Sequence, residues 1–274
     1  MNIDVVLCPT DFSDASARAI GYARALARLG SAKLIGLHVE EPALVATAAG
    51  TRRDAAARRV ADIDVEVAAG KPADVIAQYA PFCAADVIVI GTRGASGFRH
   101  FLLGSVTEDV IRQSVVPVLS IPPNAALEPH LPFNRMLFAT DLSAASLAAM
   151  SAALRLAHDT TSMTMLHVID DPDENELFVA RPYDVHHHAA EREANLRDSL
   201  DGIVRNKFAG RTAPDVRIVR GHTAHQILSV ASELGADLLV MGVHGRNALD
   251  TAIFGSTTNQ VVRRASCPVL TARC

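Results

Sequence analysis

The sequence contains no tryptophan, and aromatic residues make up only 4% of its 274 residues. The core must therefore be built from Ala, Val, Leu and Ile, within a hydrophobic fraction of 49%. That fraction is too high for a disordered chain, and the length suggests about two domains. The net charge is -4 and there is no basic stripe, so we expect neither a nucleic acid nor a membrane as partner.

Signals for secretion, membrane insertion and disulfide frameworks are also missing. The four cysteines show no CxxC spacing, which predicts reduced thiols, and Cys8 and Cys267 lie in apolar stretches where they should pack. No apolar run approaches the ~20 residues of a spanning helix. The opening residues MNIDVVLCPTDFS read as a strand rather than as a signal peptide. These features predict a cytoplasmic location.

The chain contains an internal repeat. Residues 9–39 resemble residues 139–168, and residues 86–119 resemble residues 237–270. The offset between equivalent residues is 129 at the end of the first pair of segments and 151 throughout the second pair. The second half therefore holds 22 extra residues between its second and third strands. A repeat of this length indicates a duplicated domain.

The junction between the two copies is rich in proline. Four prolines occur within residues 121–134, which is typical of a linker. We place the first domain at residues 1–122 and the second at residues 134–274, with residues 123–133 as the linker.

Each half reads as strands alternating with helices. The strands are short continuous apolar runs such as DVIVIG and DLLVMG, as expected when helices cover both faces of a sheet. Right-handed crossovers then give two tandem doubly wound five-stranded parallel sheets, a Rossmann-like α/β fold. Ser13 and Ser143 suit the N-caps of the first helix in each half. The expected strands are 3–8, 33–39, 63–68, 86–91, 117–121, 135–139, 163–169, 215–220, 237–242 and 268–272. The expected helices are 13–29, 73–84, 105–114, 143–159, 184–208, 223–234 and 256–265, with a short one near 51–61.

A glycine-rich loop follows the fourth strand of each half. Its pattern is Gly, two residues, Gly, nine residues, Gly and then Ser. Glycines let backbone N–H groups approach an anion and tolerate positive φ, and the helix that follows offers unpaired N–H groups and a partial positive charge. The loop residues are Gly91, Gly94, Gly104 and Ser105 in the first half, and Gly242, Gly245, Gly255 and Ser256 in the second. The helix starts add Val106 and Thr107 in the first half, and Thr257 and Thr258 in the second.

The loop pattern has alternatives. A GxxxxGK[ST] loop is absent and no GxGxxG follows a first strand, so the chain is neither an ordinary P-loop ATPase nor a typical dinucleotide enzyme. The glycines could also serve only to turn the chain and to pack a helix against the sheet. In open α/β sheets ligands bind beyond the carboxyl ends of the strands, where both loops and the segments with Asp11 and Asp141 are expected.

These residues carry a resemblance to a known family. The segments PTDFS (9–13) and ATDLS (139–143), the two LHV segments (37–39 and 166–168) and the two glycine loops resemble the universal stress protein family in its tandem form. The resemblance covers nearly the whole chain and implies the fold of the adenine-nucleotide alpha hydrolases. The Gly-x2-Gly-x9-Gly-Ser/Thr loop is similar to that of the ATP-binding branch.

The resemblance implies a ligand and two sites. ATP is the expected ligand, and a Mg or Mn ion bound to its phosphates is an optional cofactor. An Asp after the first strand and a Val at the end of the second would hold the adenosine part, and the glycines and Ser would hold the ribose and phosphates. This assigns Asp11, Val39, Gly91, Gly94, Gly104 and Ser105 to site one, and Asp141, Val168, Gly242, Gly245, Gly255 and Ser256 to site two. The first half departs from the pattern, because only about 20 residues separate its second and third strands.

Histidines supply the other candidates. His186, His187 and His188 are consecutive, so on a helix they point about 100° apart and do not suit one metal ion. His222 and His225 have i, i+3 spacing at a helix start, which suits either a metal pair or a solvated surface. His38 and His167 are equivalent strand residues and should be packed and hydrogen-bonded, not catalytic.

The sequence thus predicts a stress-response protein that binds an adenine nucleotide and acts as a sensor or regulator. A weak ATPase or phosphotransferase and a ligand-free scaffold are the alternatives. No paired carboxylate, activating base or arginine-finger pattern supports turnover. The expected partners are the nucleotide, the other half of the chain in a pseudo-dimer joined through the fifth strands, a second copy in a homodimer, and an unidentified protein.

Overall fold

The computed structural model describes residues 3–41, 63–92, 103–127, 129, 131–170, 182–244 and 254–274, without the side chains of residues 182–192. The first half contains β1 (Val5–Pro9), α1 (Asp14–Gly30), β2 (Lys33–Glu40), β3 (Val65–Ala69), α4 (Pro72–Phe82), β4 (Val87–Gly91), α5 (Ser105–Gln113) and β5 (Val118–Ile121). The second half contains β6 (Arg135–Ala139), α6 (Ala144–Leu156), β7 (Ser162–Ile169), α8 (Pro182–Lys207), β8 (Asp215–Arg220), α9 (Thr223–Leu234), β9 (Leu238–Gly242), α10 (Ser256–Arg264) and β10 (Val269–Ala272).

These elements follow the predicted alternation closely. Helix α4 ends at Phe82 rather than at residue 84, because Ala84 takes a left-handed conformation with φ of 53°. Ser13 and Ser143 are confirmed as N-caps, since each side chain accepts a hydrogen bond from the backbone N–H three residues later. The short helix expected near 51–61 lies outside the described residues.

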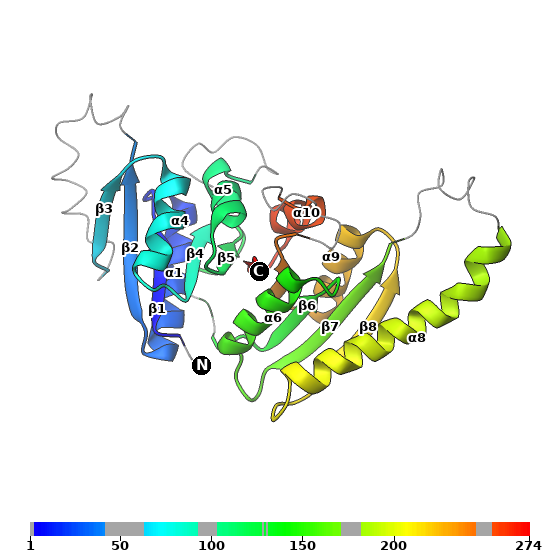
Figure 1. The fold of residues 1–274 in the computed structure, drawn as a ribbon. Helices are drawn as coiled ribbons and strands as arrows, with labels where there is room; N and C mark the ends of the chain where they lie inside the picture. The colour runs from blue at the N-terminus through cyan, green and yellow to red at the C-terminus, as the bar shows by residue number, and fades with distance from the viewer. Residues whose placement is uncertain are drawn as a thin grey trace.

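The two halves share one sheet of ten strands, in the order β3-β2-β1-β4-β5-β10-β9-β6-β7-β8 (Figure 1). Pairing is parallel within each half, and only at the junction does β5 run antiparallel to β10. There Leu119 lies opposite Leu270, its own counterpart in the repeat. A residue that faces its counterpart marks a pseudo-two-fold axis, as in an isologous dimer. The expected pseudo-dimer through the fifth strands is confirmed, and the two predicted five-stranded sheets are continuous.

Helices cover both faces of the sheet (Figure 1). Val6 and Phe138 point into a core formed with α1, α6 and α8, while the neighbouring Leu7 and Leu137 point into a second core formed with α4, α5, α9 and α10. This arrangement explains the continuous apolar strands, since successive side chains enter opposite cores. The cores are mainly aliphatic, as the shortage of aromatic residues requires.

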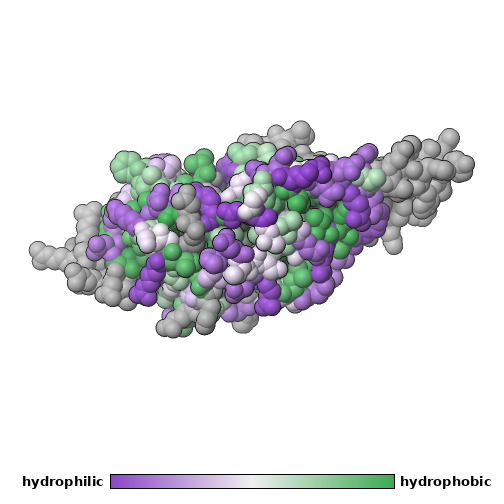
Figure 2. Space-filling model, turned by 90° about the horizontal axis from the view of Figure 1, so that it is seen from below, coloured by the Kyte–Doolittle hydropathy of each residue, from purple (hydrophilic) through white to green (hydrophobic). Residues whose placement is uncertain are grey.

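The surface and the thiols agree with the sequence. Hydrophobic residues form small separate groups among hydrophilic ones on the face shown in Figure 2. Within the described ranges, no helix is both long and apolar enough to cross a bilayer. Burial raises the pKa of Cys8 to about 12 and that of Cys267 to about 11, so both thiols are protonated core residues, as expected.

Candidate functional site

The strand order brings the candidate residues of each half to one edge of the sheet. In the first half β1 pairs with both β2 and β4, so the ends of these three strands are neighbours. In the second half β6 pairs in the same way with β7 and β9. The residues predicted for site one, Asp11, Val39, Gly91, Gly104 and Ser105, and those predicted for site two, Asp141, Val168, Gly242, Gly255 and Ser256, therefore lie at or next to the ends of neighbouring strands. Gly94 and Gly245 lie outside the described residues.

The turn after the first strand is strained in the same way in both halves. Phe12 and Leu142, which follow the two aspartates, have φ of 61° and 66° although neither is glycine. The hydroxyl of Thr10 accepts a hydrogen bond from the N–H of Phe12 at 3.0 Å, and Thr140 does the same for Leu142 at 3.0 Å. Left-handed non-glycine residues cost energy and concentrate at functional sites, so the turn marks a candidate site.

A histidine holds each turn from the second strand. Nδ1 of His38 lies 2.8 Å from the carbonyl oxygen of Thr10, and Nδ1 of His167 lies 2.8 Å from that of Thr140. Because a carbonyl only accepts, Nδ1 carries the proton in both rings. The ring of His38 also contacts that of Phe12, with centroids 4.7 Å apart. The structural role expected for both histidines is confirmed.

The two aspartates are fixed differently. Oδ1 of Asp11 accepts hydrogen bonds from both the N–H and the hydroxyl of Ser13, at 3.0 and 2.5 Å. Oδ1 of Asp141 accepts from the N–H of Ser143 at 3.0 Å, but the Ser143 hydroxyl points to the carbonyl of His244 at 3.5 Å. Both carboxylates are therefore oriented acceptors. In site two the serine also links the aspartate turn to the segment after β9.

Helices α5 and α10 begin directly beside the ends of β4 and β9. The N–H of Gly104 donates to the carbonyl of Thr92 at 2.8 Å, and that of Gly255 donates to Val243 at 3.1 Å. Ser105 and Ser256 are the first helical residues, and neither helix has a side-chain cap, so the first N–H groups of each helix lack an intrahelical or capping partner. A helix start in this position suits an anion.

The reason for glycine at the helix start differs from the predicted one. Gly104 and Gly255 have φ of -63° and -56°, so a positive φ is not the reason for glycine at these two positions. Space is the constraint at Gly255, because a Cβ there would lie 2.9 Å from the carbonyl oxygen of Val243. Such a contact is too short for any side chain.

Packing also explains the first glycine of each loop. A Cβ on Gly91 would lie 2.8 Å from the carbonyl oxygen of Ala15 in α1, and one on Gly242 would lie 2.6 Å from the N of Ser146 in α6. These glycines bring the first turn of a second helix close to each site. Their tight packing matches the alternative considered from sequence, and it is compatible with a ligand at the same edge.

The threonines at the helix starts point inward. The hydroxyl of Thr107 donates to the carbonyl of Gly91 at 2.7 Å, and that of Thr258 donates to Gly242 at 2.9 Å. Both side chains are buried, so they fix the helix to the strand. Val106 packs against the core. Ser105 and Ser256 are exposed and Thr257 is half-buried, which leaves them as the side chains at the helix start that can meet a ligand.

Val39 and Val168 pack in part against the second core. Each stands near the end of its strand, two residues after the leucine whose carbonyl accepts from Thr10 or Thr140. Thr10 with Thr140 and Ser16 with Ser146 were not singled out from the sequence, although the hydroxyls of Thr10 and Ser16 lie 3.1 Å apart and those of Thr140 and Ser146 lie 2.9 Å apart beside the aspartate turns. Their signal in the sequence is that Thr10 with Thr140 and Ser16 with Ser146 are identical at equivalent repeat positions.

Metal binding by the protein alone finds no support in the described part of the chain. There, no group of three or more His, Cys, Asp or Glu residues is placed to hold an ion. His222 is the N-cap of α9, and His225 does not join it in such a group. His186, His187 and His188 belong to α8, but their side chains lie outside the description.

The strand order and the duplicated sheet edge define a tandem α/β protein whose two halves share one mostly parallel sheet. Comparison with known proteins makes the class specific. Residues 40–122 and 132–273 both match the model of the universal stress protein family. The chain belongs to the universal stress protein family, in its two-domain form.

Individual relatives agree. The chain is 28% identical over 195 residues to universal stress protein Rv2005c of Mycobacterium tuberculosis, which covers 69% of this chain and 62% of that protein. It is 30% identical over 147 residues to universal stress protein YxiE of Bacillus subtilis, covering 52% of this chain and 99% of that protein. A universal stress protein structure from Archaeoglobus fulgidus shares the fold, with a TM-score of 0.66, 24% identity and coverage of 100% and 99%. The matches to the mycobacterial relative thus span about three fifths of its length.

Proposed function

We propose that the chain binds an adenine nucleotide, with ATP as the ligand, at the carboxyl edge of each half and acts as a nucleotide-responsive regulator. The observation that carries this proposal is the convergence, in both halves, of a strained aspartate turn and a helix start on adjacent strands. The turn supplies a carboxylate and the helix supplies unpaired N–H groups. A nucleotide carries matching groups, with amino and hydroxyl donors at one end and phosphates at the other.

Each residue then has a defined task. Asp11 and Asp141 accept hydrogen bonds from the adenosine part, against Val39 and Val168. The N–H groups that follow Gly104 and Gly255, with the hydroxyls of Ser105 and Ser256, donate to phosphate oxygens. A Mg or Mn ion, where it takes part, would be held mainly by the phosphates, which fits the absence of a three-ligand cluster in the described residues. Gly94 and Gly245 belong to the proposal through the sequence pattern.

Regulation rather than turnover is proposed because no group within the described site is arranged as a catalytic base. His38 and His167 direct Nδ1 at a backbone carbonyl. Asp11 and Asp141 each accept a hydrogen bond at Oδ1 from the N–H of the serine two residues later, and their task in this proposal is to accept, not to remove a proton. We also keep the division at residues 123–133 as a proposal, with one nucleotide for each resulting domain.

The proposal is tested by denaturing the purified chain and measuring the released nucleotides by mass spectrometry, beside an assay of phosphate release. Bound ATP without phosphate release supports it. ADP with slow phosphate release would identify a weak ATPase. Protein that carries no nucleotide, and that acquires none after incubation with ATP, would leave the scaffold as the remaining alternative.

A further inference from the structure

The phosphate-binding helices of the two proposed sites differ in charge. Helix α5 of site one carries Glu108, Asp109 and Arg112, a formal charge of -1, whereas α10 of site two carries only Arg263 and Arg264, a formal charge of +2. Glu108 lies in the first turn of α5. A carboxylate there competes with a bound phosphate for the positive end of the helix dipole and repels it.

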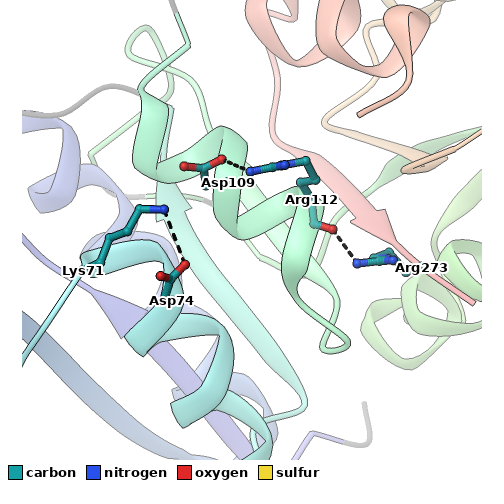
Figure 3. Close-up of polar contacts among 5 residues, drawn as sticks. All are labelled: Lys71, Asp74, Asp109, Arg112 and Arg273. Carbon is teal, nitrogen blue, oxygen red and sulfur yellow. Dashed lines mark hydrogen bonds and ion pairs between the residues drawn. The ribbon is translucent and has the colours of Figure 1, made fainter. Parts of the chain in front are cut away.

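The second half offsets that charge. Nη2 of Arg263, on α10, lies 3.6 Å from Oε2 of Glu108 on α5, so the two helices are linked across the pseudo-two-fold axis. Both helices lie on the same face of the sheet and beside each other in Figure 1. Nη1 of Arg273, directly after β10, donates to the carbonyl of Arg112 in the last turn of α5 at 2.5 Å (Figure 3). Two guanidinium groups of the second half thus contact the helix of site one.

The repeat shows that the first half does not supply equivalent contacts to the helix of site two. The counterpart of Glu108 is Asn259 and that of Arg263 is Arg112, so the mirrored contact would lack a carboxylate. Arg112 instead forms an ion pair with Asp109 within its own helix, at 2.5 Å (Figure 3). The counterpart of Arg273 is Pro122, which has no side-chain donor.

We infer that Arg263 is an electrostatic residue of site one, supplied by the second half, which offsets Glu108 and thereby strengthens binding of the nucleotide's phosphates. The inference rests on the proposed nucleotide function. Site one is accordingly complete only within the tandem chain. The two members of the pair are each about one third exposed, with 34% of each side chain accessible, so the effect is moderate and sensitive to salt.

The test is a calorimetric titration of the full chain, with site two silenced by Asp141→Ala and with ATP and adenosine as probes. Arg263→Gln should weaken ATP binding at site one about two- to fivefold, the range expected of a partly exposed ion pair. Adenosine, which has no phosphate, should bind unchanged. In a background that contains Glu108→Gln, the same Arg263→Gln substitution should have little effect, because the charge that it offsets is gone.

Arg264→Gln is the matched control, since it removes the same charge from the neighbouring exposed position of α10. It should leave ATP binding at site one nearly unchanged. Site-one binding of ATP that is indifferent to Arg263→Gln, or that weakens equally with and without Glu108, would overturn the inference while the proposed function stands. A chain that binds ATP at neither site would overturn both.

Discussion

Arg155, on helix α6 of the second half, donates through Nη2 to Oδ1 of Asp86, at the start of β4 in the first half, at 2.6 Å. Oδ2 of the same aspartate accepts from the N–H groups of Asp4 and Val5 at 2.6 and 3.0 Å. Asp86 therefore fastens β1 to β4 and joins the two halves at once. Its counterpart Asp237 fastens β6 to β9 through the N–H groups of residues 134 and 135, at 2.7 and 2.9 Å.

Comparing Asp86 with its counterpart Asp237 isolates the contribution of the Arg155–Asp86 ion pair to stability. Asp86→Ala and Asp237→Ala should each reduce the free energy of unfolding by about 1–3 kcal/mol, because each removes two hydrogen bonds to backbone N–H groups, worth about 0.5–1.5 kcal/mol each. Asp86→Ala should cost up to about 1 kcal/mol more, the value of a partly exposed ion pair. Arg155→Ala should reduce the free energy of unfolding only by the value of the ion pair, up to about 1 kcal/mol. Urea titrations of the three variants give these values, and a larger loss for Asp237→Ala than for Asp86→Ala would contradict the account.

The Asp86 carboxylate also predicts a dependence on pH. Burial acts to raise its pKa, but the N–H of Asp4, the guanidinium of Arg155 and the N–H of Val5 together lower it below its usual value. A folded-state pKa below that of the unfolded chain, about 3.9, means that the contribution to stability is complete above that value. It is lost as the pH falls through the folded-state pKa. The urea midpoint of Asp86→Asn should change less than that of the parent chain between about pH 5 and pH 3. Equal changes in the two proteins would rule this out.

A difference in packing accompanies the junction. Tyr22 of α1 is buried, but its counterpart in α6 is Ala152, which lines a cavity of about 10 Å³ beside Asp86 and Arg155. Tyr22→Ala should reduce stability by about 3 kcal/mol, as expected for a large aromatic side chain removed from a core. Ala152→Leu should change it by less than about 1 kcal/mol, because Ala152 is only half-buried and a longer side chain there can extend toward solvent. Thermal melts compare the two, and a similar loss for both would show that the halves pack equivalently.

Gly255 has no room for a side chain beside the Val243 carbonyl, whereas a glycine in the middle of an exposed helix does. Gly255→Ala would place a Cβ 2.9 Å from the Val243 carbonyl, which must displace the start of α10 and reduce nucleotide binding at site two. Gly202, within α8, is the control, because the nearest atom to its added Cβ is 4.0 Å away on the Arg205 side chain. Gly202→Ala should stabilise the chain by about 0.5–1 kcal/mol and leave binding intact. Retained nucleotide content in Gly255→Ala would count against the helix start as a phosphate site.

Much of this fold is predictable from the sequence, because the pattern for most elements occurs twice, at equivalent positions of the repeat. The pairing of β5 with β10 follows from two equivalent apolar strands that each need an edge partner. The inward turn of Thr107 and Thr258 was not predictable, because a hydroxyl at a helix start looks the same whether it meets a strand carbonyl or a ligand. Positive φ occurs at Phe12 and Leu142 and not at the described loop glycines, Gly91, Gly104, Gly242 and Gly255. It accompanies hydrogen bonds that the hydroxyls of Thr10 and Thr140 accept from the N–H groups of Phe12 and Leu142, which no local pattern specifies.

The asymmetry of the chain was only partly visible in the sequence. The 22 extra residues of the second half predicted a helix at 184–208, and α8 spans Pro182–Lys207. Contacts across the junction, such as Arg155 with Asp86 and Arg263 with Glu108, join residues that are 69 and 155 positions apart. In each pair one member has an uncharged counterpart in the repeat, Ala25 for Arg155 and Asn259 for Glu108. Only the three-dimensional arrangement relates them.

The most direct test of the central claim is a calorimetric titration of the full chain with ATP. Two binding events are expected, and the event at site two should be the tighter because α10 carries more positive charge than α5 and because the longer second half supplies α8. Asp141→Ala should abolish the tighter event and Asp11→Ala the weaker one, while each variant stays folded and melts cooperatively. No binding by the parent chain, or two events that persist unchanged in both variants, would contradict the account.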